Sequence, residues 1–176
     1  FSASFASVQR TTIINKSKEL MQLMEMQPHD FVLHHSDKDL KTLLKFKHRT
    51  FNSDDLLFFI QSLKNIYNNG GLEKAFSTKK SVKEAIDNFR NIFLKTEHLK
   101  RSEKHISSPE SGSAAKRLNM FLRWMVRKDR NGVDFGIWKN IKSSELMSPF
   151  DVHSGNVARK LGLLNSFQNT WKSVDE

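Results

Sequence analysis

Apolar side chains recur every three or four positions along most of this chain, and this spacing predicts a protein built almost entirely of α-helices. Capping residues and the turn formers Pro and Gly separate the apolar runs. We expect helices at 8–27, from 36 through 44, and at 53–66, 81–93, 113–128 and 151–164, with 45–49 as a basic connector and 105–112 as a loop. One short extended piece is allowed for within 133–138. The predicted fold class is all-α.

The positive charge of the chain changes what it is expected to bind. Its 176 residues carry 29 Lys and Arg against 19 Asp and Glu, a net charge of +10 at pH 7. Residues 79–130 alone hold 14 Lys and Arg against 6 Asp and Glu, a net of +8. Such a segment suits a polyanion, because each phosphate that a cation neutralises releases a counterion. The charge favours nucleic-acid binding, and a basic face that only aids solubility stays open as the alternative.

The residue types that are missing exclude several kinds of chemistry. The sequence has no Cys, which excludes disulfides, a thiolate nucleophile, Cys-ligated zinc and an iron–sulfur cluster. The histidines, His34 and His35 included, lack metal-ligand spacing, so we expect no metal and no other cofactor. No apolar run is long enough to span a membrane and no signal-peptide pattern is present. We expect a cytoplasmic monomer that contacts no membrane, with both termini, at Phe1 and Glu176, incomplete.

The segment 148–164 carries the first candidate for chemistry. It reads Ser-Pro-Phe-Asp-Val-His-Ser-Gly-Asn-Val-Ala-Arg-Lys-Leu-Gly-Leu-Leu, so a proline turn delivers Asp151 to the start of an amphipathic helix. Most Asp residues in this position only cap the helix, because the side-chain oxygen accepts N–H groups of the first turn. The same environment keeps a carboxylate ionised. Capping and a catalytic role for Asp151 are therefore compatible.

The helix predicted from Ser113 carries the second candidate. A helical projection places one polar stripe opposite one apolar stripe: Lys116, Asn119, Arg123 and Arg127 against Leu118, Phe121, Leu122 and Met125. A solvated basic stripe is the ordinary interpretation. Lysine in a first helical turn is disfavoured by the helix dipole, however, so Lys116 is expected to have another role. The loop 109–112 directly before this helix is expected to offer backbone N–H groups to a DNA phosphate.

These two segments carry a resemblance to known proteins. The chain looks like a conserved-hypothetical bacterial family, which is itself similar to the helix-hairpin-helix DNA glycosylase superfamily. Segment 148–164 resembles the "Asp-Thr-His-Val … Arg-Leu-Gly-Leu" segment of that superfamily, and Ala115-Lys116 with Phe121 is most similar to its archaeal 8-oxoguanine glycosylase branch. The loop departs from the usual Leu-Pro-Gly-Val-Gly hairpin. Lys116 lies four residues after Gly112 instead of two, which turns a helical side chain by about 200°.

The resemblance implies a fold, a reaction and a set of site residues. The fold is a single helix-hairpin-helix glycosylase-like domain over residues 1–176, with two helical lobes and a central cleft. The reaction is excision of a damaged base such as 8-oxoguanine, which is flipped out of duplex DNA. Lys116 would attack the sugar and, through a Schiff base, permit strand cleavage by AP-lyase elimination, while Asp151 would stabilise the cationic sugar. Burial, Arg117 and Arg123 are expected to favour the neutral amine of Lys116. The predicted DNA-binding residues are Pro109, Gly112, Ser113, Arg117, Arg123, Arg127, His153 and Arg159.

Two other functions stay open at this point. A non-catalytic DNA- or RNA-binding helix-hairpin-helix module would use the same basic face, with Asp151 as a cap and Lys116 as a phosphate contact. A helical protein-interaction domain would bind DNA too weakly to measure at physiological salt. Gln9 and Arg10 lie where the superfamily often has a Gln-Gln-Thr-like segment, which makes them candidates for contacts to the flipped base or its opposite strand, but they are more simply helix surface. The damaged base is not encoded by any motif.

Overall fold

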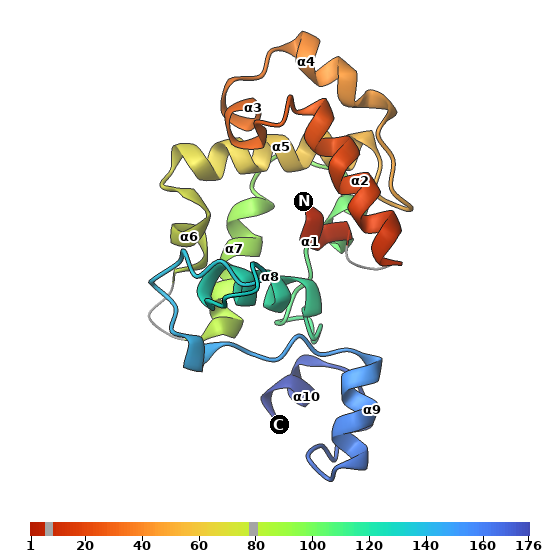
Figure 1. The fold of residues 1–176 in the computed structure, drawn as a ribbon, viewed down its shortest axis with the longest axis vertical. Coiled ribbons are helices and arrows are strands. Elements are labelled where there is room, and N and C mark those ends of the chain that lie inside the picture. Colours follow the sequence, from red (N-terminus) through yellow and green to blue (C-terminus); the bar gives the residue numbers. More distant parts are fainter. Residues whose placement is uncertain (6–8, 78–80) are drawn as a thin grey trace. The chain divides into compact units, whose positions relative to one another are not determined.

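The computed structural model describes residues 1–5, 9–77 and 81–176, and it confirms that the chain is mostly helical (Figure 1). Among these residues, β-type pairing is limited to the isolated bridges His48–Phe51, Ser113–Thr170 and Lys128–Phe135. The α-helices are α1 (Ser2–Phe5), α2 (Arg10–Leu23), α3 (Pro28–His34), α4 (Asp37–Thr42), α5 (Ser53–Asn68), α6 (Gly71–Phe76), α7 (Val82–Phe93), α8 (Lys116–Val126), α9 (Val152–Lys160) and α10 (Trp171–Asp175). Short 3-10 helices are η1 (Leu43–Lys45), η2 (Lys100–His105) and η3 (Ser143–Glu145).

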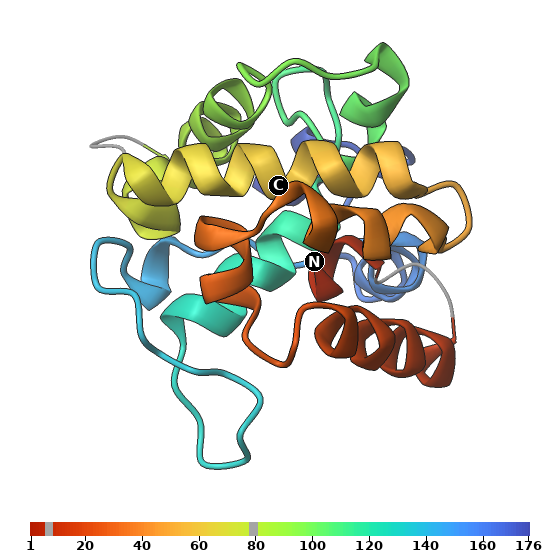
Figure 2. The same cartoon turned by 90° about the horizontal axis from the view of Figure 1, so that it is seen from above.

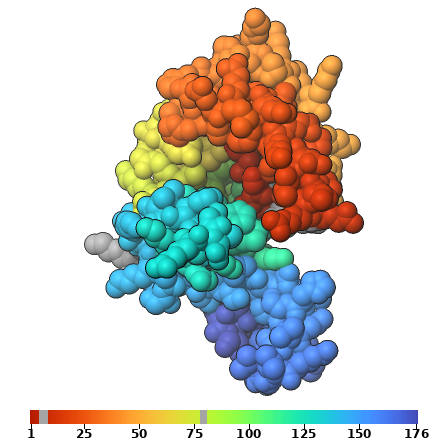
Figure 3. Space-filling view, viewed as in Figure 1, coloured from red at the N-terminus to blue at the C-terminus, as the bar shows by residue number. Residues whose placement is uncertain are grey.

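The chain forms two compact units, and each is built from two separate stretches of sequence. Unit 1 comprises Phe1–Ala75 and Asn91–Ile106, and unit 2 comprises Phe76–Arg90 and Ser107–Glu176. In unit 1, α5 packs against α3 and η1 (Figure 2), while α2 lies at the surface (Figure 3). The core of unit 1 is rich in aromatic rings, with edge-to-face contacts of Phe93 to Phe58 and Phe59 at centroid distances of 5.3 and 4.9 Å.

Unit 2 has its own aromatic core, to which the middle of α8 contributes Phe121. Phe76 stacks on Phe89 at 4.2 Å between ring centroids and also contacts Phe121 and Trp138. Leu122, on the inner face of α8, is completely buried. A smaller apolar cluster of Ala114, Phe150 and Leu164 joins the segment before α8 to the segment before α9. Unit 2 therefore contains both candidate motifs.

The predicted end of the first helix is wrong in an instructive way. Helix α2 ends at Leu23, because Glu25 and Met26 both adopt positive φ (54° and 57°). Pro28, which we expected to terminate this helix, instead occupies the first turn of α3. Proline suits that place, because the first helical N–H has no partner to lose. Val8, the predicted start of this helix, lies outside the described residues.

Other predicted bounds need smaller corrections. Helix α5 begins at Ser53 as predicted but continues to Asn68, and Asn52 caps it in a reciprocal capping box with Asp55. The short helix α6 follows the Asn-Asn-Gly-Gly segment and was not predicted. The strongest predicted helix begins at Lys116, three residues later than expected, and ends at Val126. The segment 133–138 forms only the single bridge from Phe135 to Lys128.

Candidate functional site

Lys116 and Asp151, the two predicted catalytic residues, meet in unit 2. The Lys116 Nζ donates to Asp151 Oδ2 at 2.6 Å, although 35 residues separate them in the chain. The Lys116 side chain is 40% exposed and that of Asp151 is 29% exposed. A molecule arriving from solvent can therefore reach both charged groups.

Asp151 is fixed by the start of α9. Its Oδ1 accepts the Ser154 N–H at 2.9 Å, and its own N–H donates to Ser154 Oγ at 2.8 Å, which completes a capping box. The predicted capping role is confirmed. The hydrogen bond from Lys116, followed by that from the Ser154 N–H, holds the pKa of the Asp151 carboxyl well below its usual range, against a smaller opposing effect of burial. Asp151 is a stable anion that retains an exposed face.

Lys116 is aimed by an irregular turn before α8. The chain turns tightly at 108–113, where Gly112 N–H donates to Pro109 O at 2.9 Å and Ser113 N–H to Ser108 O at 3.0 Å. Ala115 then adopts a left-handed conformation (φ 45°, ψ 38°), which is unfavourable for a residue with a Cβ atom. The buried Asn119 side-chain amide donates to Ala114 O at 3.1 Å and so stabilises this turn. Helix α8 consequently begins at Lys116 itself.

An apolar cluster supports the ion pair. Ala114, two residues before Lys116, and Phe150, directly before Asp151, are both buried in the cluster with Leu164. Gly155 lets the Phe150 ring lie close to α9, since a Cβ atom at Gly155 would meet Phe150 Cζ at 2.8 Å and Asn169 Oδ1 at 2.7 Å. The positions of the two charged groups therefore follow from buried apolar contacts next to them in sequence.

The backbone of the loop 109–112 does not lie as the hairpin interpretation expects. The N–H of Glu110 donates to Asp87 Oδ1 at 3.2 Å, and the N–H of Ser111 donates to Ser108 Oγ at 3.1 Å. The Gly112 carbonyl accepts the N–H of Trp171 at 2.9 Å. These amide groups have partners inside unit 2, so a phosphate would have to displace them. DNA contacts by Pro109, Gly112 and Ser113 stay predictions.

The predicted basic stripe of α8 is tied to a buried carboxylate. Asp134, whose side chain is 1% exposed, pairs with Arg123 Nε at 3.3 Å and Arg127 Nε at 3.6 Å. Arg127 already lies beyond the end of α8 as its C-cap. Asn119 is buried rather than part of a polar surface stripe, which corrects the helical projection. Each arginine keeps about half of its side chain exposed, so part of each guanidinium can still face an anion.

The other predicted DNA-binding residues have different surroundings. His153 is exposed on the first turn of α9. The Arg159 guanidinium donates to Ser166 O at 2.6 Å and to Asn169 Oδ1 at 2.9 Å, so it holds the loop after α9. Burial lowers the pKa of Arg117. Lys116, for which burial and neighbouring arginines were expected to favour the neutral amine, instead contacts the Asp151 carboxylate.

Two other kinds of feature are absent from the part of the chain that the structure describes. Across residues 1–5, 9–77 and 81–176, no group of three or more His, Asp or Glu side chains is placed to hold a metal ion. The helices in these ranges are all too short or too polar to cross a lipid bilayer.

Sequence analysis missed a basic pocket in unit 1. It lies beside the segment 44–53 and η2 and has a volume of about 500 Å³. The signal was present in the Lys-Phe-Lys-His-Arg run at 45–49, which we interpreted only as a connector.

Comparison with known proteins places the chain in a family. Residues 1–176 match the family described as "Protein of unknown function (DUF2400)". The chain belongs to the DUF2400 family. No curated protein and no solved structure matches it. The match to the DUF2400 family covers both units. The Lys116–Asp151 pair is the chemical feature of this DUF2400 protein from which a function can be argued.

Proposed function

We propose that this DUF2400 protein is a DNA glycosylase with AP-lyase activity, with Lys116 as nucleophile and Asp151 as the stabilising carboxylate. The observation that carries the proposal is the 2.6 Å contact between Lys116 and Asp151, the two residues for which the resemblance to helix-hairpin-helix glycosylases implies catalytic roles. An amine that can form an imine beside a carboxylate is the minimal equipment for this chemistry. The net charge of +10 supports a nucleic acid as substrate.

The proposed reaction begins at the sugar of a flipped nucleotide. The bond from C1′ to the base nitrogen breaks, and the base departs with the bonding electron pair and takes up a proton. The sugar becomes cationic at C1′, and the Asp151 carboxylate stabilises this charge. Lys116 gives up a proton to Asp151, which passes it on toward the leaving base, and the Lys116 nitrogen then forms a bond to C1′.

The second part of the proposed reaction uses the bond between Lys116 and the sugar. Cleavage of C1′–O4′ opens the ring, with O4′ taking a proton, and leaves a protonated imine between Nζ and C1′. Loss of a C2′ proton then expels the 3′ phosphate oxygen by elimination. Because the imine is essential, only a primary amine at this position can serve.

Borohydride trapping tests this proposal directly. The purified chain is incubated with duplexes that carry 8-oxoguanine, uracil, thymine glycol or an abasic site, and the imine is reduced to a stable adduct. We expect an adduct for the natural protein and none for Lys116→Ala or Lys116→Arg. The arginine variant is the sharper one, because it keeps a cation beside Asp151 but cannot form the imine.

Lys160→Ala is the matched control, since Lys160 is an exposed lysine of unit 2 at the end of α9. It should leave trapping unchanged. An adduct that persists in Lys116→Ala would overturn the assignment of the nucleophile. Absence of both an adduct and base release on every duplex would overturn the glycosylase proposal as a whole.

Non-catalytic nucleic-acid binding is the second candidate. The observation in its favour is that Asp151 already has a complete structural role as the cap of α9. Under this alternative, Lys116→Ala weakens duplex binding by the loss of one phosphate contact, and no duplex yields an adduct or a released base.

A further inference from the structure

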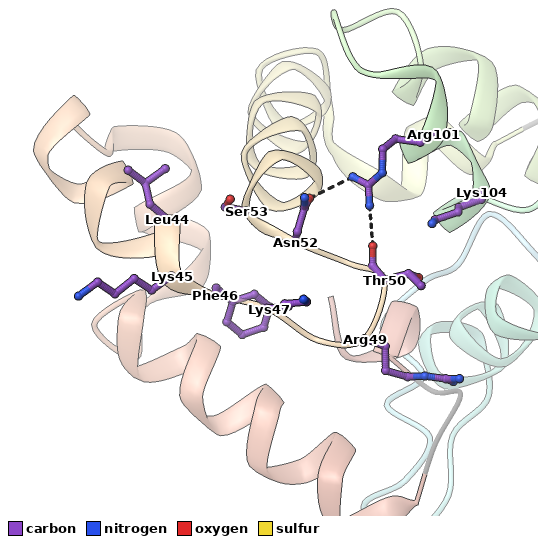
Figure 4. Close-up of a pocket in the computed structure, with 10 residues that line it drawn as sticks. All are labelled: Leu44, Lys45, Phe46, Lys47, Arg49, Thr50, Asn52, Ser53, Arg101 and Lys104. Carbon is purple, nitrogen blue, oxygen red and sulfur yellow. Dashed lines mark hydrogen bonds between the residues drawn. The ribbon is translucent and has the colours of Figure 1, made fainter.

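The basic pocket of unit 1 is lined by charged and polar side chains with no part in the chemistry above. Ten residues line it: Leu44, Lys45, Phe46, Lys47, Arg49, Thr50, Asn52, Ser53, Arg101 and Lys104 (Figure 4). Five of these described residues are cations, and no carboxylate side chain is among them. Its volume of about 500 Å³ falls within the range of pockets that hold small molecules.

The segment 46–51 supplies one wall through an alternation of buried and exposed residues. Phe46, His48 and Phe51 are 1%, 5% and 3% exposed, whereas Lys47 and Arg49 between them are exposed. His48 and Phe51 exchange backbone hydrogen bonds of 2.8 and 3.0 Å, which closes a tight turn. The buried residues anchor the turn, and its cations face outward.

Helix η2 supplies the opposite wall. In a 3-10 helix, residues three apart lie above one another, so Arg101 and Lys104 share one side while Ser102 and His105 share another. Ser102 and His105 are buried and face Asp55, with Ser102 Oγ donating to Asp55 Oδ1 at 2.6 Å. Arg101 and Lys104 are exposed toward the pocket.

Arg101 ties the two walls together. Its guanidinium donates to Thr50 O at 2.7 Å, to Asn52 Oδ1 at 3.1 Å and to both Asp55 oxygens at 3.1 Å. Asp55 offsets the charge of Arg101. In Figure 4, Lys104 extends toward Arg101 and Thr50, whereas Lys45 and Arg49 point away in opposite directions.

The lining also indicates which part of a ligand would be recognised. Stacking of nucleic-acid bases needs an exposed aromatic face, and Phe46, the one aromatic residue of the lining, is only 1% exposed. Lysine and arginine side chains with a hydroxyl and an amide nearby instead suit phosphate oxygens. We infer that the pocket lined by Lys47, Arg101 and Lys104 binds a phosphate group. This inference does not depend on the reaction proposed for Lys116.

The phosphate could belong to a nucleic-acid backbone or to a small phosphorylated molecule, and the experiment separates these sources. The first arm follows backbone amide NMR shifts of the chain during titration with inorganic phosphate, against chloride at equal ionic strength. We expect shifts confined to 44–53 and 100–105 for the natural protein and their loss in Lys47→Ala/Lys104→Ala. Arg101 is left intact, because its removal would strand the buried Asp55.

The second arm measures binding of an undamaged duplex over a range of salt concentrations. Log affinity falls as log salt concentration rises. If the pocket binds a backbone phosphate, the double variant should make this fall shallower by about 1 to 2 in slope. Lys38→Ala, which removes an exposed lysine of α4 outside the pocket, should change the slope less. Phosphate-dependent shifts with an unchanged slope would assign the site to a small phosphorylated molecule.

Phosphate shifts that are absent, or that survive in the double variant, would overturn the inference. Borohydride trapping provides an independent readout. If the natural protein shows the phosphate-dependent shifts but forms no borohydride adduct, the result counts against the glycosylase proposal alone.

Discussion

Two ion pairs in this molecule use similar residues at the start of a helix but differ in access to solvent. In unit 1, Asp55 in the first turn of α5 pairs with Arg101 at 3.1 Å, and its side chain is fully buried. In unit 2, Asp151 at the start of α9 pairs with Lys116 at 2.6 Å, and its side chain is 29% exposed. Both carboxylates belong to capping boxes.

The two cations are equally exposed, at 40% of each side chain, and they differ in chemistry. Arginine stays protonated, and Arg101 reaches both Asp55 oxygens through Nη1 while Nη2 donates to Thr50 O, so it links the buried carboxylate to the neighbouring backbone. Lysine can lose its proton and become a nucleophile, which is of use only where a substrate can reach it. A carboxylate–cation pair at a helix start is thus a candidate for chemistry when its carboxylate is exposed and when its cation is lysine.

The largest expected effect comes from removing the buried carboxylate. Asp55→Ala removes the partner of Arg101 and the acceptor for the Ser102 hydroxyl and the Asn52 N–H, so we expect the free energy of unfolding to fall by about 2–4 kcal/mol. Urea unfolding measures this change. Asp54→Ala, which removes the exposed neighbouring carboxylate, should cost about 0.5 kcal/mol or less. Equal losses in the two variants would contradict the structural role given to Asp55.

A smaller effect is expected when the support of the exposed pair is disturbed without a change of charge. In Gly155→Ala the new Cβ atom collides with Phe150, and the better helix propensity of Ala offsets part of the cost. We expect a net loss of about 1–2 kcal/mol in urea unfolding and weaker borohydride trapping, because Phe150 precedes Asp151. Asn156→Ala, at the exposed next position, should affect neither.

Substitution of Asp151 should separate stability from activity. Asn caps a helix about as well as Asp, so Asp151→Asn should change the free energy of unfolding by no more than about 0.5 kcal/mol, whereas Asp151→Ala should cost about 1 kcal/mol. Both variants should lose base release if the glycosylase proposal is right. Base release that persists in Asp151→Asn would leave Asp151 as a cap only.

The smallest effect is a difference in pH dependence. Burial alone would raise the pKa of Asp55, but hydrogen bonds from Ser102 and Asn52 and the charges of His105 and Arg101 lower it, and the pKa of Asp151 is lowered by Lys116 and Ser154. Because both pKa values are depressed in the folded protein, the stabilisation is complete above the unfolded value of about 3.9 and is lost as the pH falls below it.

Urea unfolding at pH 7, 5 and 3 checks this expectation. The natural protein should have a higher free energy of unfolding than Asp55→Asn, and this difference should shrink between pH 5 and pH 3. The smaller difference from Asp151→Asn should shrink over the same range. A difference in unfolding free energy that grows toward pH 3 would show that the pKa of the substituted carboxyl is not lowered in the folded protein.

The sequence was sufficient to predict the elements whose signals are local. The apolar spacing predicted the all-α class, and the segment before Val152 predicted the Asp151 cap that the structure confirms. The bounds were less accurate where backbone geometry decides them. Ala115 in a left-handed conformation starts α8 late, and no sequence rule favours alanine there.

The environment of each charge could not be predicted from the sequence. The helical projection placed Arg123 and Arg127 on a free stripe, but it could not foresee that Asp134 folds back beneath them from the following loop. Lys116 and Asp151 were selected by resemblance, and spacing along the chain could not show that they are in contact. The basic pocket was missed for a similar reason, since its two walls come from segments about fifty residues apart.

The division of both units into two stretches of sequence has a consequence for synthesis of the protein. Residues 91–106 complete unit 1, so this unit cannot finish folding when Ala75 leaves the ribosome. At about 5–20 residues per second, translation needs roughly two to six more seconds to reach residue 106. During that interval the aromatic residues of α5 lack Phe93, and Asp55 lacks Arg101. A nascent chain stalled before residue 91 would therefore expose the incomplete core of unit 1, and we expect chaperones to bind the nascent chain most at this stage of synthesis.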